Sequence, residues 1–275
     1  MKILICTDGS ASSIQSADLV VRFGFPAQTS ITVLGVSENE QDLEKITSAM
    51  NLIESKLGKS YPLEVKVRQG EPIKEIISEA LEMQSDLVAV GSGGKQLSLL
   101  HPQLGSTTSK LARNLFTHFL VTRNLPAELT KVLVCAGIEA PTSMTISIAG
   151  QILSNVPAQL GLLHVLPKIA ASRVVSRTTT DQKDDSREYA ANDPEKLLAR
   201  TSQQLRQSGI KGEIIPIVRY GLVVEEVLSE LSAGGYDLLV VGSHYQPGQD
   251  RWLGTLLDDV TDQLLNRSAC SVLII

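Results

Sequence analysis

The sequence predicts an α/β protein made of two copies of one Rossmann-like domain, each an open parallel sheet with helices on both faces. Three observations predict it: a repeat that spans each half of the chain, short runs that are apolar along their whole length, and segments of helical period between them. Strands that are apolar throughout belong to sheets covered on both faces. Regular alternation of strands and helices then favours right-handed parallel crossovers.

The repeat is clearest in two blocks that each open on a glycine, residues 70–92 and 221–243. In both, that glycine stands 16 positions before an aspartate and 21 positions before the glycine that ends an apolar run. The two halves also begin alike, with Lys-Ile-Leu-Ile-Cys from residue 2 and Lys-Val-Leu-Val-Cys from residue 131. A repeat of about half the chain predicts two homologous domains rather than a solenoid.

Ten apolar runs are expected to form strands, five in each half, at 3–7, 31–36, 65–68, 87–90, 119–123, 132–136, 160–165, 213–218, 238–241 and 271–275. A helical stripe from Ile14 to Phe23 predicts a first helix that Pro26 closes. A second stripe covers 73–81, with Pro72 in its first turn. A third helix is expected to open at Gly105.

The joint between the domains is short, at residues 124–130, so we expect domains at 1–124 and 131–275 that pack closely. The second copy carries an insertion at about 168–192. Its polar and non-periodic sequence predicts a loop.

Composition excludes several classes of function. A net charge of −5 and 4% aromatic residues give no attraction to nucleic acid and no platform for stacking bases. No apolar run approaches the roughly 20 residues of a membrane span. The first apolar run is too short for a signal peptide, and three cysteines without a Cys-x-x-Cys pair indicate neither a disulfide framework nor a zinc site. The four histidines are scattered, so no metal site is predicted, and a cytoplasmic protein is expected.

The residues that could carry chemistry gather at one edge of the first predicted sheet. Its fourth strand runs into Gly91-Ser92-Gly93-Gly94-Lys95, and Gly105-Ser106-Thr107 then starts a helix. Glycines let backbone N–H groups approach a ligand, and a helix N-terminus with two hydroxyls suits a phosphate. Lys95 would add positive charge. Asp8 follows the first strand at the same carboxyl edge, where open α/β sheets bind ligands. The glycines and Asp8 also have a plainer interpretation as turn residues, with Ser10 capping the first helix.

The spacing Gly91-x2-Gly94-x10-Gly105-Ser106 resembles the nucleotide-binding signature of the universal stress protein family, Gly-x2-Gly-x9-Gly-Ser/Thr. The resemblance extends over nearly the whole chain, twice, which is typical of a tandem member. It implies a strand order of 3-2-1-4-5 in each domain and ATP, or a related adenine nucleotide, between strands one and four, with Mg²⁺ as a further expectation. One extra residue before Gly105 implies a bulged loop.

By this resemblance the first domain would hold the nucleotide. Asp8, with its neighbours Thr7 and Gly9, would meet the adenine or ribose, and the backbone of Val36 would bond the adenine. The residues expected to border the ribose and phosphates are Val90, Gly91, Gly94, Lys95, Gly105, Ser106 and Thr107. In the second copy Gly137 stands where Asp8 does and Tyr245 replaces the second glycine. That site is therefore predicted to be degenerate.

Three functions stay open on the sequence. The first is a stress-response regulator that binds an adenine nucleotide in domain 1 without dedicated catalysis. The second is a structural or chaperone-like module that needs no nucleotide. The third is a slow ATPase, although no general base is placed to activate water, so at most weak hydrolysis is expected.

Both repeats end in an apolar strand, which the resemblance places at a sheet edge. An exposed apolar edge is normally paired or covered. We therefore expect the two domains to form a pseudo-twofold pair that imitates a dimer within one chain, with surfaces left for a further homodimer.

Overall fold

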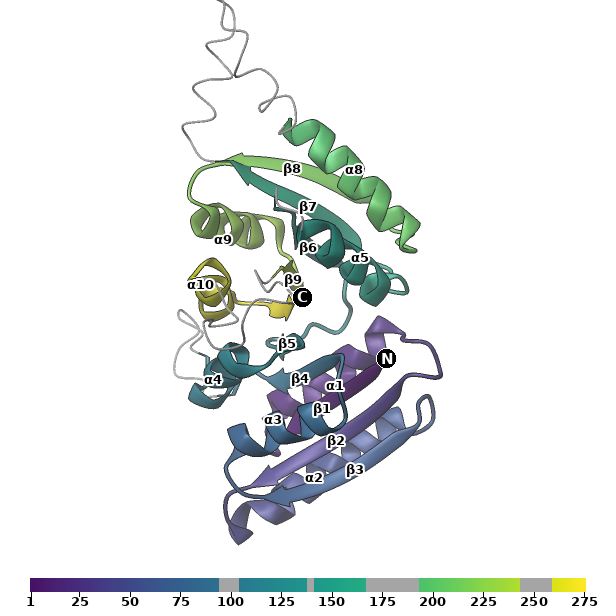
Figure 1. The fold of residues 1–275 in the computed structure, drawn as a ribbon, viewed down its shortest axis with the longest axis vertical. Coiled ribbons are helices and arrows are strands. Elements are labelled where there is room, and N and C mark those ends of the chain that lie inside the picture. The colour runs from purple at the N-terminus through teal and green to yellow at the C-terminus, as the bar shows by residue number, and fades with distance from the viewer. Residues whose placement is uncertain (94–103, 138–140, 167–192, 243–258) are drawn as a thin grey trace, which may run out of the picture. The chain divides into compact units, whose positions relative to one another are not determined.

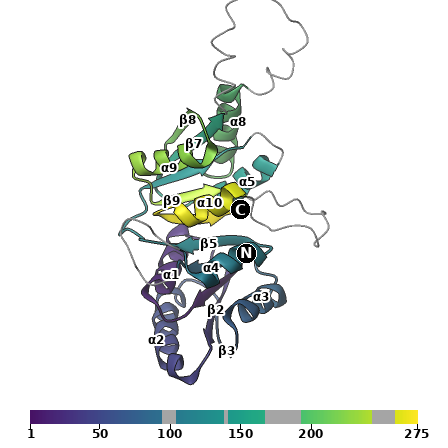
Figure 2. The same ribbon diagram turned by 90° about the vertical axis from the view of Figure 1, so that its left-hand side faces the viewer.

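The computed structural model describes residues 1–93, 104–137, 141–166, 193–242 and 259–275. Its contacts divide the chain into two compact units (Figures 1 and 2). Unit 1 comprises Met1–Glu128 and Ser243–Ile275, and unit 2 comprises Leu129–Gly242. Among the described residues, no helix combines the length and the apolar composition that crossing a membrane requires.

The elements of the first repeat alternate as the sequence predicts. In chain order they are β1 Lys2–Thr7, α1 Ala11–Phe23, β2 Ser30–Ser37, α2 Glu40–Leu57, β3 Leu63–Gln69, α3 Pro72–Glu82, β4 Leu87–Gly91, α4 Ser106–Asn114 and β5 His118–Thr122.

The first five strands of unit 1 are parallel and follow the order β3-β2-β1-β4-β5. The chain moves outward from β1 to β3 and then returns through β4 to β5. With right-handed crossovers this reversal places α1 and α2 on one face of the sheet and α3 and α4 on the other. Accordingly α1 packs on α2 and α3 packs on α4. The reversal lies between β1 and β4, as the family resemblance implies.

Local signals explain where the helices of unit 1 begin and end. Ser10 caps α1 by accepting a hydrogen bond from the backbone of Ser13, and Pro72 occupies the first turn of α3. At its C-terminus α1 ends at Phe23, the last residue of the predicted stripe, but Gly24 rather than Pro26 closes it. Gly24 adopts a left-handed conformation there (φ 61°) and its N–H bonds the carbonyl of Val21, so Gly24 stops the helix before Pro26.

The second repeat has the same order of elements. They are β6 Lys131–Cys135, α5 Pro141–Leu153, β7 Gln159–Leu166, α8 Pro194–Gln207, β8 Ile214–Tyr220, α9 Val223–Gly234, β9 Leu238–Val241, α10 Asp259–Arg267 and β10 Ser271–Ile274. Within unit 2 the parallel order is β8-β7-β6-β9. The insertion expected at 168–192 lies outside the described residues.

The last strand of the second repeat belongs by its contacts to unit 1. β10 pairs with β5 in antiparallel fashion, with Val272 opposite Val121 and Ile274 opposite Phe119. Arg113 of α4 also makes an ion pair with Asp262 of α10, at 2.8 Å. Each repeat thus contributes five strands, as predicted, and the apolar edge of β5 is covered by β10.

A buried ion pair recurs at the same position in both repeats. The Glu79 side chain on α3 is 1% exposed and binds Arg68 and Lys66 of the edge strand β3. The corresponding Glu230 on α9 binds Arg219 of β8. Since β3 and β8 end their sheets, these pairs hold each edge strand to the helix behind it.

Candidate functional site

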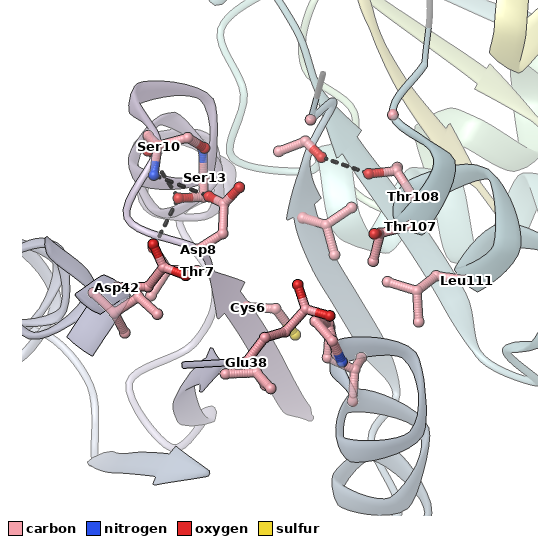
Figure 3. Close-up of a pocket in the computed structure, with 18 of the residues that line it drawn as sticks. Cys6, Thr7, Asp8, Ser10, Ser13, Glu38, Asp42, Thr107, Thr108 and Leu111 are labelled. Carbon is pink, nitrogen blue, oxygen red and sulfur yellow. Dashed lines mark hydrogen bonds between the residues drawn. The ribbon is translucent and has the colours of Figure 1, made fainter. Parts of the chain in front are cut away.

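A cavity of about 410 Å³ opens at the carboxyl ends of the parallel strands of unit 1, within the usual range for ligand pockets. Its walls come from the turn between β1 and α1, from the ends of β2 and β4, and from the first turns of α2, α3 and α4. Figure 3 shows Asp8, Ser10 and Ser13 on one wall and Thr107, Thr108 and Leu111 on another. The cavity lies where the strand order reverses, which is where such sheets bind ligands.

The structure brings eight of the eleven predicted nucleotide-binding residues into this cavity. They are Thr7, Asp8, Val36, Val90, Gly91, Gly105, Ser106 and Thr107. Gly9 is not one of the described lining residues; it shapes the turn beneath, with φ 78°. Gly94 and Lys95 lie outside the described residues, so their contribution stays a prediction.

The turn after β1 is tied by its own polar groups. The backbone N–H of Ser10 donates to Asp8 Oδ1 at 2.9 Å, and that of Gly9 donates to Thr7 Oγ1 at 3.1 Å. Thr7 Oγ1 also shares a hydrogen bond with Ser13 Oγ at 2.7 Å. Both interpretations of Asp8 therefore hold geometrically: it organises the turn, and its side chain also lines the cavity.

Asp8 carries a negative charge at neutral pH. Burial raises the pKa of its carboxyl group, but hydrogen bonds from Ser10 and Ser13 and the nearby charge of Lys45 outweigh that effect and leave the pKa below its ordinary value. Lys45 reaches this place from α2 because its stem lies over Gly9. A Cβ atom added to Gly9 would come within 2.7 Å of Lys45 Cγ.

Glycine is needed at the end of β4 for a different reason at each position. A Cβ atom on Gly91 would lie 2.6 Å from the backbone nitrogen of Ser13, so Gly91 allows α1 to pack against the strand. Thr108 Oγ1 donates to the Gly91 carbonyl at 3.1 Å. Gly93 adopts a left-handed conformation, with φ 60°, which glycine reaches without strain. Gly91 therefore has a packing role beside any role in binding.

The N-terminus of α4 faces the cavity without a side-chain cap. The Gly105 N–H donates to the Ser92 carbonyl at 2.9 Å, and the first helical bond runs from Ser109 to Gly105. The N–H groups of the first turn then have no partner inside the helix. With the hydroxyls of Ser106 and Thr107 beside them, they form a place for an anionic group.

The sequence reasoning missed the contribution of α2. Glu38, Asp42 and Lys45 line the cavity because α2 begins at the carboxyl end of β2, next to Asp8. The signal was Asn39, whose side chain accepts from the Asp42 N–H and caps α2 there. Further lining residues that it missed are Cys6, Ile46, Ile76, Thr108 and Leu111.

The cavity is electrically uneven. Among the described lining residues, the carboxylates of Asp8 and Asp42 lie on the side of β1 and α2, whereas that of Glu38 extends beside Cys6 toward the middle of the cavity, and Lys45 is the single cation. The uncapped α4 lies on the other side. Cys6 is buried between them, and burial raises the pKa of its thiol so that it stays protonated. Within the described residues, no group of three His, Cys, Asp or Glu side chains could hold a metal ion.

The second repeat lacks these features in its described part. By strand register, Ala136 and Gly137 stand where Thr7 and Asp8 do. His164 takes the place of Gly35, and its Nδ1 bonds the Ala136 carbonyl at 2.8 Å. The residues from Tyr245 to Gly254, on which the prediction of a degenerate site also depends, lie outside the described residues.

Comparison with known proteins agrees with the tandem architecture. The model of the universal stress protein family matches residues 1–123 and again 129–275. A protein of unknown function from Pseudomonas aeruginosa PAO1 has a similar structure, with a TM-score of 0.70 at 16% identity, covering 100% of this chain and 92% of that one. A universal stress protein from Archaeoglobus fulgidus DSM 4304 has a TM-score of 0.65 at 16% identity, over 99% and 97% of the two chains. A search of curated proteins finds no significant match.

Proposed function

We propose that this chain, which belongs to the universal stress protein family, is a regulatory protein that binds ATP or a related adenine nucleotide in unit 1. The observation that carries the proposal is the cavity of about 410 Å³ that brings Asp8 and the uncapped N-terminus of α4 to one place. The proposal includes no dedicated catalysis. A cytoplasmic location, a Mg²⁺ ion and a homodimer remain predictions from the sequence.

The unevenness of the cavity gives the nucleotide one favourable orientation. Phosphates suit the α4 side, because backbone N–H groups, the Ser106 and Thr107 hydroxyls and the helix dipole all favour negative charge there. The ribose hydroxyls and the adenine amine are hydrogen-bond donors, so they suit the carboxylates of Asp8 and Asp42 on the opposite side. The reverse orientation would bring phosphates against the carboxylates of Asp8 and Asp42.

The nucleotide would act by shifting the equilibrium between two conformations of the protein. A ligand shifts a conformational equilibrium only by its difference in affinity for the two conformations. Because the cavity is walled by α2, α3 and α4, a bound nucleotide contacts helices from both faces of the sheet. The proposed regulatory effect is a change in how these helices present themselves to a partner.

The test is isothermal titration calorimetry of folded, ligand-free protein with adenosine, AMP, ADP and ATP. Asp8→Ala removes a charged hydrogen-bonding group, for which we expect a loss of affinity of about 10- to 100-fold. Gly105→Val places a side chain at the start of α4 and should weaken the phosphate-bearing ligands more than adenosine.

Asp18→Ala is the matched control, because Asp18 lies on α1, pairs with Lys56 and is not a described lining residue of the cavity. It should bind as the unmodified protein does. Absence of heat with all four ligands would remove the nucleotide proposal and favour a module that needs no nucleotide. Binding that survives both Asp8→Ala and Gly105→Val would place the site elsewhere.

A further inference from the structure

The strand pairing of unit 1 brings an arginine and a cysteine close together, just beyond the paired ends of β5 and β10. Val121 of β5 pairs with Val272 of β10, and continuing this antiparallel register places Arg123 opposite Cys270. The Ser271 hydroxyl fixes the register, since it accepts from the Arg123 N–H and donates to the Arg123 carbonyl, both at 3.1 Å. Arg123 directly follows β5 and Cys270 directly precedes β10, and negative charge at Cys270 acts on the Arg123 guanidinium, so the two side chains lie near one another.

Arg123 is a buried cation with an incomplete set of partners. The residue is 3% exposed. Its Nη1 donates to the carbonyl of Ser268, just after α10. Its Nε and Nη2 are buried and make no hydrogen bond, and no ion pair joins Arg123 to a carboxylate among the described residues. A buried guanidinium without a counter-ion is costly, so an anion beside it would stabilise the structure.

The thiol of Cys270 is the group placed to become that anion. Burial lowers the pKa of Arg123 to about 10, while negative charge at Cys270 raises it. The effect is mutual, because a guanidinium close to a thiol stabilises the thiolate and lowers the pKa of the cysteine. Cys270 is half-buried, so reagents can reach it.

The other charged side chains of α10 and β5 do not oppose the formation of a thiolate at Cys270. Arg267, also positive, lies in the last turn of α10, close to Cys270 in the chain. Asp259 and Asp262 lie in the first turn, at the other end of the helix, and Asp262 is paired with Arg113. His118 begins β5, at the far end of that strand.

We propose that Cys270 is a reactive thiol, activated by Arg123, and a site of oxidation by hydroperoxides. The thiolate sulfur attacks the terminal peroxide oxygen, so that an S–O bond forms as the O–O bond breaks. The sulfur is oxidised to a sulfenic acid and the peroxide is reduced to an alcohol, or to water for hydrogen peroxide, after the leaving oxyanion takes a proton from solvent. This site is separate from the nucleotide cavity and does not depend on it.

The two other cysteines provide an internal reference. Cys6 and Cys135 are held in β1 and β6, and burial raises the pKa of both thiols, that of Cys135 to about 12. Cys6 is buried, whereas Cys135 is half-buried like Cys270, so the expected inertness of Cys135 rests on its raised pKa. A thiol with a raised pKa stays protonated at neutral pH, and the thiolate is the nucleophile. Modification of the folded protein should therefore be selective for Cys270.

The experiment is alkylation of the folded full-length protein with iodoacetamide between pH 5 and 10, read at each cysteine by peptide mass spectrometry. The same protein in urea gives the rates of unprotected thiols. We expect Cys270 to react at least about tenfold faster than Cys6 and Cys135 at neutral pH, with a half-maximal rate at least one pH unit below its value in urea. Hydrogen peroxide with dimedone should label Cys270, and Cys270→Ser should abolish the label.

Arg123→Met should move the pH profile of Cys270 back toward that in urea, whereas Arg123→Lys should keep most of the activation. Circular dichroism and thermal unfolding establish whether each variant is folded. If Arg123→Met does not fold, the pH profiles of Cys270 alkylation in Arg123→Lys, in the unmodified protein and in urea decide whether Arg123 activates the thiol. A native Cys270 that titrates as it does in urea, or that is unaffected by a folded Arg123→Met, would overturn the proposal.

Discussion

The turn after β1 in unit 1 and the turn after β6 in unit 2 occupy equivalent places in the two repeats. The first carries Thr7, Asp8 and Ser10, whose hydrogen bonds shape one wall of a cavity. In the second, Ala136 and Gly137 stand in the register of Thr7 and Asp8 and have neither hydroxyl nor carboxylate, while residues 138–140 lie outside the described part of the chain. The repeats therefore differ where a ligand would bind.

The framework around these turns is alike in both units. Each edge strand is held by an arginine to a buried glutamate on the helix behind it, Arg68 to Glu79 and Arg219 to Glu230. Since the ion pairs are shared and the side chains of Thr7 and Asp8 have no counterpart at Ala136 and Gly137, the requirements of folding and of binding can be separated. The comparison teaches that the second repeat supplies structure to the protein, including one strand of unit 1.

The largest effect is expected from removing that strand. Deletion of Ser271–Ile275 uncovers the apolar edge of β5 and removes Val272 and Leu273, both fully buried. We expect an insoluble protein or a thermal midpoint lower than that of any substitution below. Leu273→Ala, which keeps the strand, should cost about 2–5 kcal/mol in unfolding free energy. A truncated protein that is soluble and equally stable would show that β10 is dispensable to unit 1.

Removing the arginine from each of the two shared ion pairs should lower the unfolding free energy by different amounts. Arg219→Met leaves the Glu230 carboxylate, which is 9% exposed, without a described cation, so we expect a loss of about 3 kcal/mol in urea unfolding. Arg68→Met should cost only about 1 kcal/mol, because Lys66 remains 2.9 Å from Glu79. Lys74→Met breaks a fully exposed pair with Glu71 and should leave the stability unchanged within the error of the measurement. Equal losses at Arg68 and Arg219 would contradict this ranking.

Gly91 and Gly242 occupy equivalent positions in the two repeats, and comparing their substitution tests the packing role of Gly91. A Cβ atom on Gly91 would lie 2.6 Å from the Ser13 nitrogen, which belongs to the backbone and cannot move aside, so Gly91→Ala should cost about 1–3 kcal/mol. On Gly242 the closest atom would be Thr145 Oγ1, at 3.1 Å, a side chain that can shift. Gly242→Ala should cost less than about 1 kcal/mol by the same principle. Thermal unfolding of both variants checks the difference, and a neutral Gly91→Ala would mean that α1 is not packed as described.

The smallest expected effect is the pH dependence of the stability that Asp8 contributes. The pKa of Asp8 is lower in the folded protein than its ordinary value of 3.8, so its ionised form stabilises the fold. That contribution is complete well above pH 4 and is lost as pH falls through the folded pKa. Asp8→Asn should therefore be slightly less stable than the unmodified protein at pH 7, with the gap closing toward pH 3. Urea unfolding at both pH values measures this difference in stability. A difference that grows toward pH 3 would show that the ionised form of Asp8 destabilises the fold.

Much of this protein is determined by local sequence. Apolar runs of strand length and the repeat of half the chain predict the α/β class, and Ser10 and Pro72 mark the starts of α1 and α3. The predicted ligand edge follows as well, because parallel strands bring their carboxyl ends to one side. Thus Asp8 and Gly105, far apart in the chain, line one cavity.

Only the tertiary structure decides what depends on non-local packing. No pattern within α2 shows that Asp42 and Lys45 would lie beside Asp8, since that depends on how α2 crosses β2. The steric reason for Gly91 appears only when α1 packs against β4. Arg123 and Cys270, 147 positions apart in the chain, come close together because β5 and β10 pair in antiparallel register, with Val121 opposite Val272. Sequence periodicity reports which face of an element is buried, but not which distant element covers it.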